Sequence, residues 1–283
     1  MEIDATPPRR SFLYVPAARP ERFAKAMTSG ADMVCVDLED AVASDAKETG
    51  RRAAIAFFGE ANTSGVERLV RINGIRTAEG LADLYAFAQA DSAPDGILLP
   101  KVKSADEAEI ALDVLAAKHP NVQIHVQLET VEALEAAFVI ANTPGVASLV
   151  FGGMDMAAGL RVEPIWDALL YARQRLVHAA ATAKIDLLDM PFFGLDDEAG
   201  LKREAENAQK IGFTGKTCIH PKQVATVGTA FSPSAAEIAR ARDLIAKYEA
   251  QDQAFVVIDG VILEAPVLQR LYRTIAIADR IGA

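Results

Sequence analysis

The chain contains eight short runs of apolar residues, each followed by a loop and then by a longer segment with a different pattern. Runs of this length, apolar on both faces, predict the strands of a buried parallel sheet. In chain order the runs are SFLYVPA, ADMVCVDLED, ERLVRING, GILLPKV, QIHVQLET, SLVFGGMD, IDLLDMPF and GKTCIHP.

The segments between these runs have the spacing of helices. ERFAKAMTSG, AEGLADLYAFAQA and ADEAEIALDVLAAKH repeat apolar residues at intervals of three and four and end near Gly, Asp or Pro. Eight strand-then-helix units of about 20 to 35 residues predict an α/β fold, a (β/α)8 TIM barrel. A doubly wound sheet is the alternative, but no GxGxxG opens the first helix and GxxxxGK[ST] is absent.

The pattern changes after Pro221. A helix is expected from the Ser232-Pro233-Ser234 cap through AAEIARARDLIAKYEA, followed by two short strands around Asp259-Gly260 and a last helix, VLQRLYRTIAIADRIG. We therefore predict a catalytic TIM barrel over residues 1–231 and a C-terminal helix-hairpin-helix extension over residues 232–283. This extension exceeds what a barrel needs, so it is a packing arm or a lid.

The composition and net charge indicate which kinds of partner the chain can have. With 283 residues, 51% of them hydrophobic, and a formal charge of -10, the chain is expected to fold and to have no nucleic-acid partner. The start, MEIDATPPRR, lacks the apolar stretch of a secretory signal, and no segment reaches the ~20 apolar residues of a membrane span. Cys35 and Cys218 lie in apolar runs without metal-ligand spacing, which indicates reduced core residues. We expect a cytoplasmic protein with no membrane partner.

Candidate chemistry follows from the strand ends, because the active site of such barrels lies at the carboxyl ends of the strands. The polar residues at these ends are Asp37, Glu39, Asp40, Arg71, Asn73, Lys101, Gln127, Glu129, Asp155, Lys216 and His220.

Glu129 and Asp155 follow two adjacent strands. Two carboxylates with room for water and a chelating substrate suit Mg²⁺, which usually takes one or two protein carboxylates. Only His220 among the four histidines ends a strand, so a three-ligand zinc site is not expected. The alternative is that the two acids cap the helices that follow them.

The remaining strand-end residues each have two interpretations. Arg71 either forms an ordinary ion pair or uses its fork to hold a carboxylate or polarise a carbonyl oxygen. Lys101 either forms a Schiff base or pairs with the nearby acids, and burial beside carboxylates favours the pair. We assign Glu39 and Asp40 to the catalytic residues, as acceptors that orient Arg71 and metal-bound water. His220 is a core histidine or a catalytic group.

Several motifs together carry a family resemblance. RRSFLYVPAARPERFAKA, GADMVCVDLEDAV, LVRING, ILLPKV, VQLET, FGGMD and GKTCIHPKQV resemble the citrate lyase β-subunit-like branch of the HpcH/HpaI aldolase superfamily. The resemblance runs from about Arg10 to the last helix. It implies a Mg²⁺-dependent lyase that splits a 3-hydroxyacyl thioester, such as malyl-CoA, citramalyl-CoA or a citryl thioester, into acetyl thioester and a 2-oxo acid. The alternatives are a malyl-CoA-type thioesterase and a citrate lyase β subunit with an acyl-carrier partner.

The resemblance also implies roles for particular residues. The family's two metal ligands fall on Glu129 and Asp155, and its substrate-carboxylate arginine falls on Arg71. CoA contacts in the family come from the first strand–helix loop and nearby basic residues, here Arg19 and Arg10. The implied assembly is a homotrimer or hexamer, with the C-terminal extension packing on a neighbouring subunit.

Two stretches depart from the family pattern. Relatives often read DLxxDLG after the metal-binding acid, whereas this chain reads DMAAGLR, with Gly159 and Arg161. The family's catalytic aspartate lies in a C-terminal DGKMxDxP hairpin and reaches a neighbouring subunit's site. Here the stretch is DGVILEAP, so Glu264 takes the position of the acid and Val261 that of the lysine. We expect Glu264 to donate the proton in catalysis, the alternative being a packing or surface residue.

Overall fold

The computed structural model describes residues 8–251 and 255–283. Residues 9–228 form one compact unit, and the residues after Gly228 belong to a second. The sequence places this boundary after residue 231, a few positions later.

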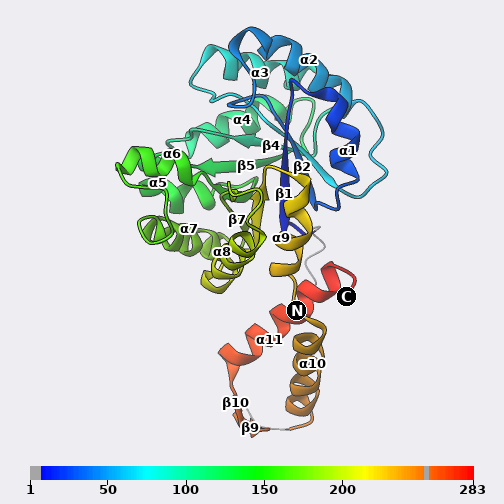
Figure 1. The fold of residues 1–283 in the computed structure, drawn as a ribbon, viewed down its shortest axis with the longest axis vertical. Coiled ribbons are helices and arrows are strands. Elements are labelled where there is room, and N and C mark those ends of the chain that lie inside the picture. Colours follow the sequence, from blue (N-terminus) through cyan, green and yellow to red (C-terminus); the bar gives the residue numbers. More distant parts are fainter. Residues whose placement is uncertain (1–7, 252–254) are drawn as a thin grey trace. The chain divides into compact units, whose positions relative to one another are not determined.

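The first unit is a closed barrel of eight parallel strands in the order of the chain, with β8 paired to β1 (Figure 1). This confirms the predicted TIM barrel. The strands are β1 (Ser11–Pro16), β2 (Met33–Asp37), β3 (Glu67–Arg71), β4 (Gly96–Leu99), β5 (Gln123–Leu128), β6 (Val146–Phe151), β7 (Asp186–Asp189) and β8 (Gly215–Cys218).

Helices follow each strand of the barrel. Several begin at a side-chain cap: Thr77, Thr130 and Asp197 each accept a hydrogen bond from a backbone N–H three residues on. The helices are α1 (Phe23–Met27), α2 (Lys47–Phe58), α3 (Ala78–Gln89), α4 (Asp106–Ala116), α5 (Val131–Ala141), α6 (Gly153–Leu160), α7 (Leu170–Ala183), α8 (Glu198–Ile211) and α9 (Val224–Ala230), with 3₁₀ turns η1 (Pro20–Arg22), η2 (Ser44–Ala46) and η3 (Pro221–Gln223).

The strands are buried on both faces, which explains why they appear in the sequence as nearly continuous apolar runs. One face packs inside the barrel, where one cluster of buried side chains contains Phe12, Met33, Cys35, Leu69, Leu98, Val150 and Leu188. Cys35 and Cys218 are both free and buried, so the prediction of reduced core cysteines is confirmed.

The strand register sets which side chains meet at the carboxyl ends. Asp37, the last residue of β2, lies opposite Arg71, the last residue of β3. Leu128 of β5 lies opposite Phe151 of β6, so the residues that follow them, Glu129 and Gly152, leave the barrel side by side.

The C-terminal unit contains α10 (Ala235–Glu249), an antiparallel hairpin of β9 (Val256–Ile258) and β10 (Val261–Leu263), and α11 (Ala265–Arg280). Both turn residues of the hairpin have positive φ, Asp259 at 50° and Gly260 at 76°, as a two-residue hairpin turn requires. This confirms the predicted helix-hairpin-helix extension. In the parts of both units that the structure describes, no helix is long and apolar enough to cross a membrane.

Candidate active site

A cavity of about 480 Å³ lies at the carboxyl ends of the barrel strands. One part of its wall is apolar and is formed mainly by Val150, Phe151, Met190, Pro191 and Phe193. The polar part is formed by Tyr14, Asp37, Asp40, Arg71, Gln127, Glu129, Asp155 and Thr217. Six of the eleven strand-end residues named from the sequence therefore line one cavity: Asp37, Asp40, Arg71, Gln127, Glu129 and Asp155.

Glu129 is fixed at the end of β5 and is only 1% exposed. Its Oε1 accepts a hydrogen bond of 2.7 Å from the backbone N–H of Lys101, and its Oε2 accepts one of 2.6 Å from Gln127 Nε2. Burial raises the pKa of Glu129 to about 8, although the Lys101 charge and the Gln127 bond oppose the rise. The helix-capping alternative is wrong for Glu129, since Thr130 is the residue that caps α5.

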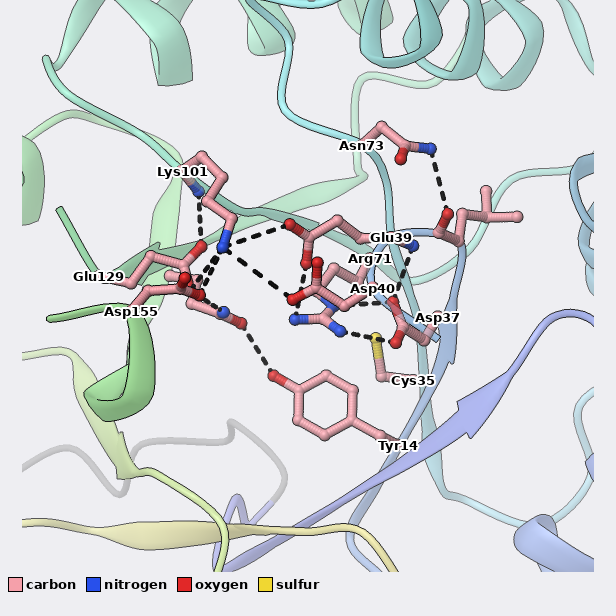
Figure 2. A network of polar contacts seen from close by, with 12 residues as sticks. Tyr14, Cys35, Asp37, Glu39, Asp40, Arg71, Asn73, Lys101, Glu129 and Asp155 are labelled. Carbon is pink, nitrogen blue, oxygen red and sulfur yellow. Dashed lines mark hydrogen bonds and ion pairs between the residues drawn. The ribbon is translucent and has the colours of Figure 1, made fainter. Parts of the chain in front are cut away.

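Gly152 allows the start of α6 to approach Glu129. A Cβ on Gly152 would lie 2.4 Å from Glu129 Cβ and 2.6 Å from its Oε2, so a side chain here would collide with the carboxylate. The close approach brings Asp155, in the first turn of α6, to the same place, where it pairs with Lys101 instead of capping the helix (Figure 2). Burial raises the pKa of Asp155, but bonds to Lys101 and Glu129 outweigh it and leave the pKa lowered.

Arg71 is buried and held by this chain's own acids. Its Nε and one terminal nitrogen donate to the two carboxylate oxygens of Asp37, at 2.8 and 2.6 Å, and its other terminal nitrogen lies 2.9 Å from Glu39 Oε2. Its guanidinium carbon stands 4.9 Å from the centre of the Tyr14 ring. Burial lowers the pKa of Arg71, but the bond and charge of Asp37 outweigh it, so the side chain is a fixed cation.

Lys101 lies among four carboxylates. Its Nζ contacts Asp155 and lies 3.8 Å from Glu129, 3.6 Å from Glu39 and 4.0 Å from Asp40 (Figure 2). Burial lowers the pKa of the Lys101 ammonium, but the neighbouring carboxylates, Glu129 first, outweigh burial and raise it. A charged ammonium is a poor nucleophile, so the geometry supports the ion-pair interpretation over a Schiff base.

The two acids of the DLED turn differ in exposure. Glu39 is buried, and burial raises its pKa against the charge of Arg71. Asp40 is largely exposed at the cavity rim. Lys47 Nζ holds the turn by donating to the backbone oxygens of Leu38 and Glu39, at 2.8 and 2.6 Å. Glu39 is therefore placed to orient Arg71, whereas Asp40 faces solvent.

Tyr14 is a site residue that the strand-end argument missed. Its hydroxyl donates a 3.0 Å hydrogen bond to Gln127 Oε1, which fixes the amide so that Nε2 donates to Glu129. The signal in the sequence is the alternation of β1, since Phe12 and Tyr14 face the barrel interior two residues apart.

The structure does not bring both predicted CoA arginines to the cavity. Arg10 precedes β1, at the opposite end of the barrel, and binds Asp32 with two side-chain nitrogens at 2.9 and 2.7 Å. Arg19 follows β1 on the cavity side of the barrel, is exposed, and has Glu21 at 3.9 Å. Of the two, only Arg19 remains where a cofactor approaching the strand ends could meet it.

Three further residues lie outside the cavity lining. Lys216 is fully buried and pairs with Asp189 and Glu204, each at 2.7 Å. His220 accepts a hydrogen bond from the backbone of Lys222 and caps η3. Glu264 is exposed at the N-cap of α11, in the C-terminal unit, and makes no capping bond.

The donor set fits Mg²⁺. Among the described side chains, no group of three or more His, Cys, Asp or Glu residues is arranged to hold a metal ion. Glu129 and Asp155 both line the cavity and are the two carboxylates that would hold an ion there. Mg²⁺ commonly binds through one or two carboxylates and keeps several waters. The balance of charged groups also suits a bound cation, because the site has two basic side chains and five acidic ones. The cations are Arg71 and Lys101, and the acids are Asp37, Glu39, Asp40, Glu129 and Asp155.

Comparison with known proteins identifies the family. A (3S)-malyl-CoA thioesterase of Cereibacter sphaeroides is 36% identical over 281 residues, covering 98% of this chain and 96% of that protein. The mitochondrial citramalyl-CoA lyase of Homo sapiens is 28% identical over 295 residues, covering 97% and 86%. CitE from Mycobacterium tuberculosis, solved in complex with magnesium, acetoacetate and coenzyme A, has a TM-score of 0.80 and 29% identity, covering 99% of this chain and 100% of that one. The profile of the HpcH/HpaI aldolase/citrate lyase family matches residues 10–221, and the chain belongs to that family.

Proposed function

We propose that this protein is a Mg²⁺-dependent lyase that cleaves a 3-hydroxyacyl-CoA thioester of the malyl-CoA, citramalyl-CoA or citryl-CoA type into acetyl-CoA and a 2-oxo acid. The observation that carries the proposal is the meeting of Glu129, Asp155 and Arg71 in one cavity. Relatives that act on malyl-CoA and citramalyl-CoA, and a relative solved with magnesium and coenzyme A, support the substrate class.

Arg71 binds the carboxylate of the hydroxy-acid end of the substrate. A guanidinium has five N–H groups, and the contacts with Asp37 and Glu39 occupy at most three of them. The other N–H groups are available to the substrate. Because Asp37 already fixes the plane of the fork, little side-chain entropy is lost when the substrate binds.

Glu129 and Asp155 would hold the Mg²⁺ ion. When bound, Mg²⁺ supplies a Lewis acid that makes the substrate hydroxyl more acidic. As the carbon–carbon bond breaks, the hydroxyl proton passes to solvent water and that oxygen becomes the carbonyl of the 2-oxo acid. The electrons of the broken bond move onto the thioester as an enolate, whose carbon must receive a proton. We assign this proton to Glu264 of a neighbouring copy, which requires an oligomer, and we propose the trimer or hexamer that the family resemblance implies.

A second candidate is hydrolysis of a malyl-CoA-type thioester. The similarity to the malyl-CoA thioesterase, which extends over 98% of this chain, favours it. In this reaction the same residues hold the substrate and water attacks the thioester carbonyl, releasing free CoA. A further candidate is a citrate lyase β subunit that acts on a carrier-bound citryl thioester.

Product analysis separates these candidates. The purified protein is mixed with malyl-CoA, citramalyl-CoA or citryl-CoA, each with Mg²⁺ or with EDTA, and the products are resolved by liquid chromatography. Acetyl-CoA and a 2-oxo acid that form only with Mg²⁺ support the lyase, whereas free CoA supports the thioesterase. A protein inert toward all three esters would contradict both and leave the carrier-dependent subunit.

Two matched variants connect activity to the site. Glu129→Gln removes a proposed metal ligand and should abolish the Mg²⁺-dependent reaction. Glu132→Gln, on the exposed side of α5 beside Lys103, should leave it unchanged.

A further inference from the structure

Lys101 lies between two pairs of acids with different proposed roles. Its Nζ contacts Asp155 and lies 3.8 Å from Glu129, the two proposed Mg²⁺ ligands (Figure 2). The same nitrogen lies 3.6 Å from Glu39 and 4.0 Å from Asp40. One ammonium is thus within reach of both pairs.

The backbone at Lys101 is in an unusual conformation. Its φ is 55°, in the left-handed region, where a residue other than Gly is disfavoured by roughly 1 kcal/mol. This conformation directs the backbone N–H at Glu129, at 2.7 Å, while the side chain reaches Asp155. Gly would adopt the same backbone conformation without strain. The presence of a lysine at this strained position therefore indicates that its side chain has a function of its own.

The ammonium and a Mg²⁺ ion would compete for the same oxygens. Mg²⁺ binds carboxylate oxygens at about 2.1 Å, and the ammonium already occupies Asp155 Oδ2. Two cations so close together would also repel each other. The Lys101 side chain is 36% exposed and flexible, and Glu39 and Asp40 offer it a second place within 4.0 Å.

We propose that Lys101 is a displaceable counter-cation, a positioning residue that lowers the Mg²⁺ affinity of Glu129 and Asp155 and moves to Glu39 and Asp40 when the metal binds. This inference rests on the proposed function, because it takes Glu129 and Asp155 as the metal ligands. It makes Lys101 a determinant of metal affinity without a direct part in the reaction.

Calorimetric titration of the whole protein with MgCl₂ tests the proposal. Lys101→Met and Lys101→Gly both remove the ammonium, and the glycine variant also keeps the left-handed backbone and the hydrogen bond to Glu129 without strain. Because Lys101 and Asp155 are both partly exposed, we expect both variants to bind Mg²⁺ only about two- to fivefold more tightly than the wild type.

Two control variants separate local charge from other effects. Lys101→Arg keeps a cation and should bind Mg²⁺ within about twofold of the wild type. Lys103→Met removes a lysine of the same segment, whose Nζ lies 3.0 Å from Glu132, and should leave the affinity unchanged.

The outcomes distinguish this inference from the proposed function. If the wild type binds Mg²⁺ but Lys101→Met and Lys101→Gly bind it equally or more weakly, the competition is refuted while the metal site stands. If the wild type takes up no Mg²⁺, the metal site fails and the inference fails with it.

Discussion

Gly152→Ala tests how closely the start of α6 must approach the buried carboxylate. The added methyl carbon would lie 2.4 Å from Glu129 Cβ and 2.6 Å from Glu129 Oε2, where about 3.5 Å is the normal separation. Neither partner is free to move. The Gly152 N–H donates to the carbonyl of Leu128 at 3.1 Å, and both oxygens of Glu129 accept hydrogen bonds.

The size of the effect follows from these restraints. Overpacking of this kind lowers the free energy of unfolding by about 1–3 kcal/mol. If Glu129 moves to relieve the collision, it stretches at least one of the two hydrogen bonds that its carboxyl oxygens accept, each of which contributes about 0.5–1.5 kcal/mol. Loss of the contacts that orient a metal ligand typically weakens metal binding about 10- to 100-fold. We therefore expect Gly152→Ala to bind Mg²⁺ about 10- to 100-fold more weakly than the wild type.

Two measurements check this prediction. Urea denaturation gives the free energy of unfolding, and calorimetric titration with MgCl₂ gives the affinity. Gly159→Ala on the same helix is the control, since its Cβ would meet only Val131 Cγ2, at 3.1 Å, and a helical Ala is favoured over Gly. If Gly152→Ala retained the wild-type unfolding midpoint and Mg²⁺ affinity, the close approach would have no part in holding the carboxylate.

Three further predictions concern charge. Arg71→Lys loses the two-point contact with Asp37 and should lower kcat/KM for the CoA ester at least about 100-fold in steady-state assays; near-wild-type kinetics would argue against a fixed fork. Because burial raises the pKa of Glu129 to about 8, calorimetry in buffers of different ionisation enthalpy should find Mg²⁺ affinity rising toward pH 8 with proton release, whereas binding without proton release would contradict the raised pKa. Glu264→Gln should lower turnover about 100-fold or more, with Glu264→Asp retaining activity; wild-type turnover in Glu264→Gln would remove this residue from proton transfer.

The raised pKa of Glu129 also fixes the sign of its contribution to stability. The folded protein binds the proton of Glu129 more tightly than the unfolded chain, whose glutamate has the ordinary pKa of 4.5. The contribution of this group to the free energy of unfolding is therefore present below about pH 4.5 and is lost as pH rises toward 8. This loss is the electrostatic reason why a buried carboxylate at this position needs a nearby cation.

The fold could be predicted because barrel strands are buried on both faces and their helices on one. A strand of that kind has to be apolar throughout, which separates it from the three-and-four spacing of the helix that follows. The hairpin was equally accessible, since Asp259 and Gly260 are the residue types that adopt positive φ at a two-residue turn. The register that places Asp37 beside Arg71 required the structure, because no local pattern aligns two strands.

The sequence predicted only those site residues that lie at or just after the carboxyl end of a strand. Arg71, Glu129 and Asp155 were found because the rule needs only to know where a strand ends. Arg10 belongs to the same motif as β1 but precedes it, and six strand residues at about 3.3 Å each separate it from the cavity end. Tyr14 is central in its strand and enters the site only because β1 turns it inward.

Lys101 and Gly152 show why the remainder of the site could not be predicted. Nothing in LPKV indicates a left-handed lysine, because its conformation is maintained by bonds to Glu129 and Asp155, which are distant in sequence. Gly152 has a φ of -91°, which any residue can adopt, so no turn explains it. Glycine is needed there because the Glu129 carboxylate lies where a side chain on residue 152 would be. Conversely, Glu129 can occupy this buried position only because the residue that follows β6 is a glycine.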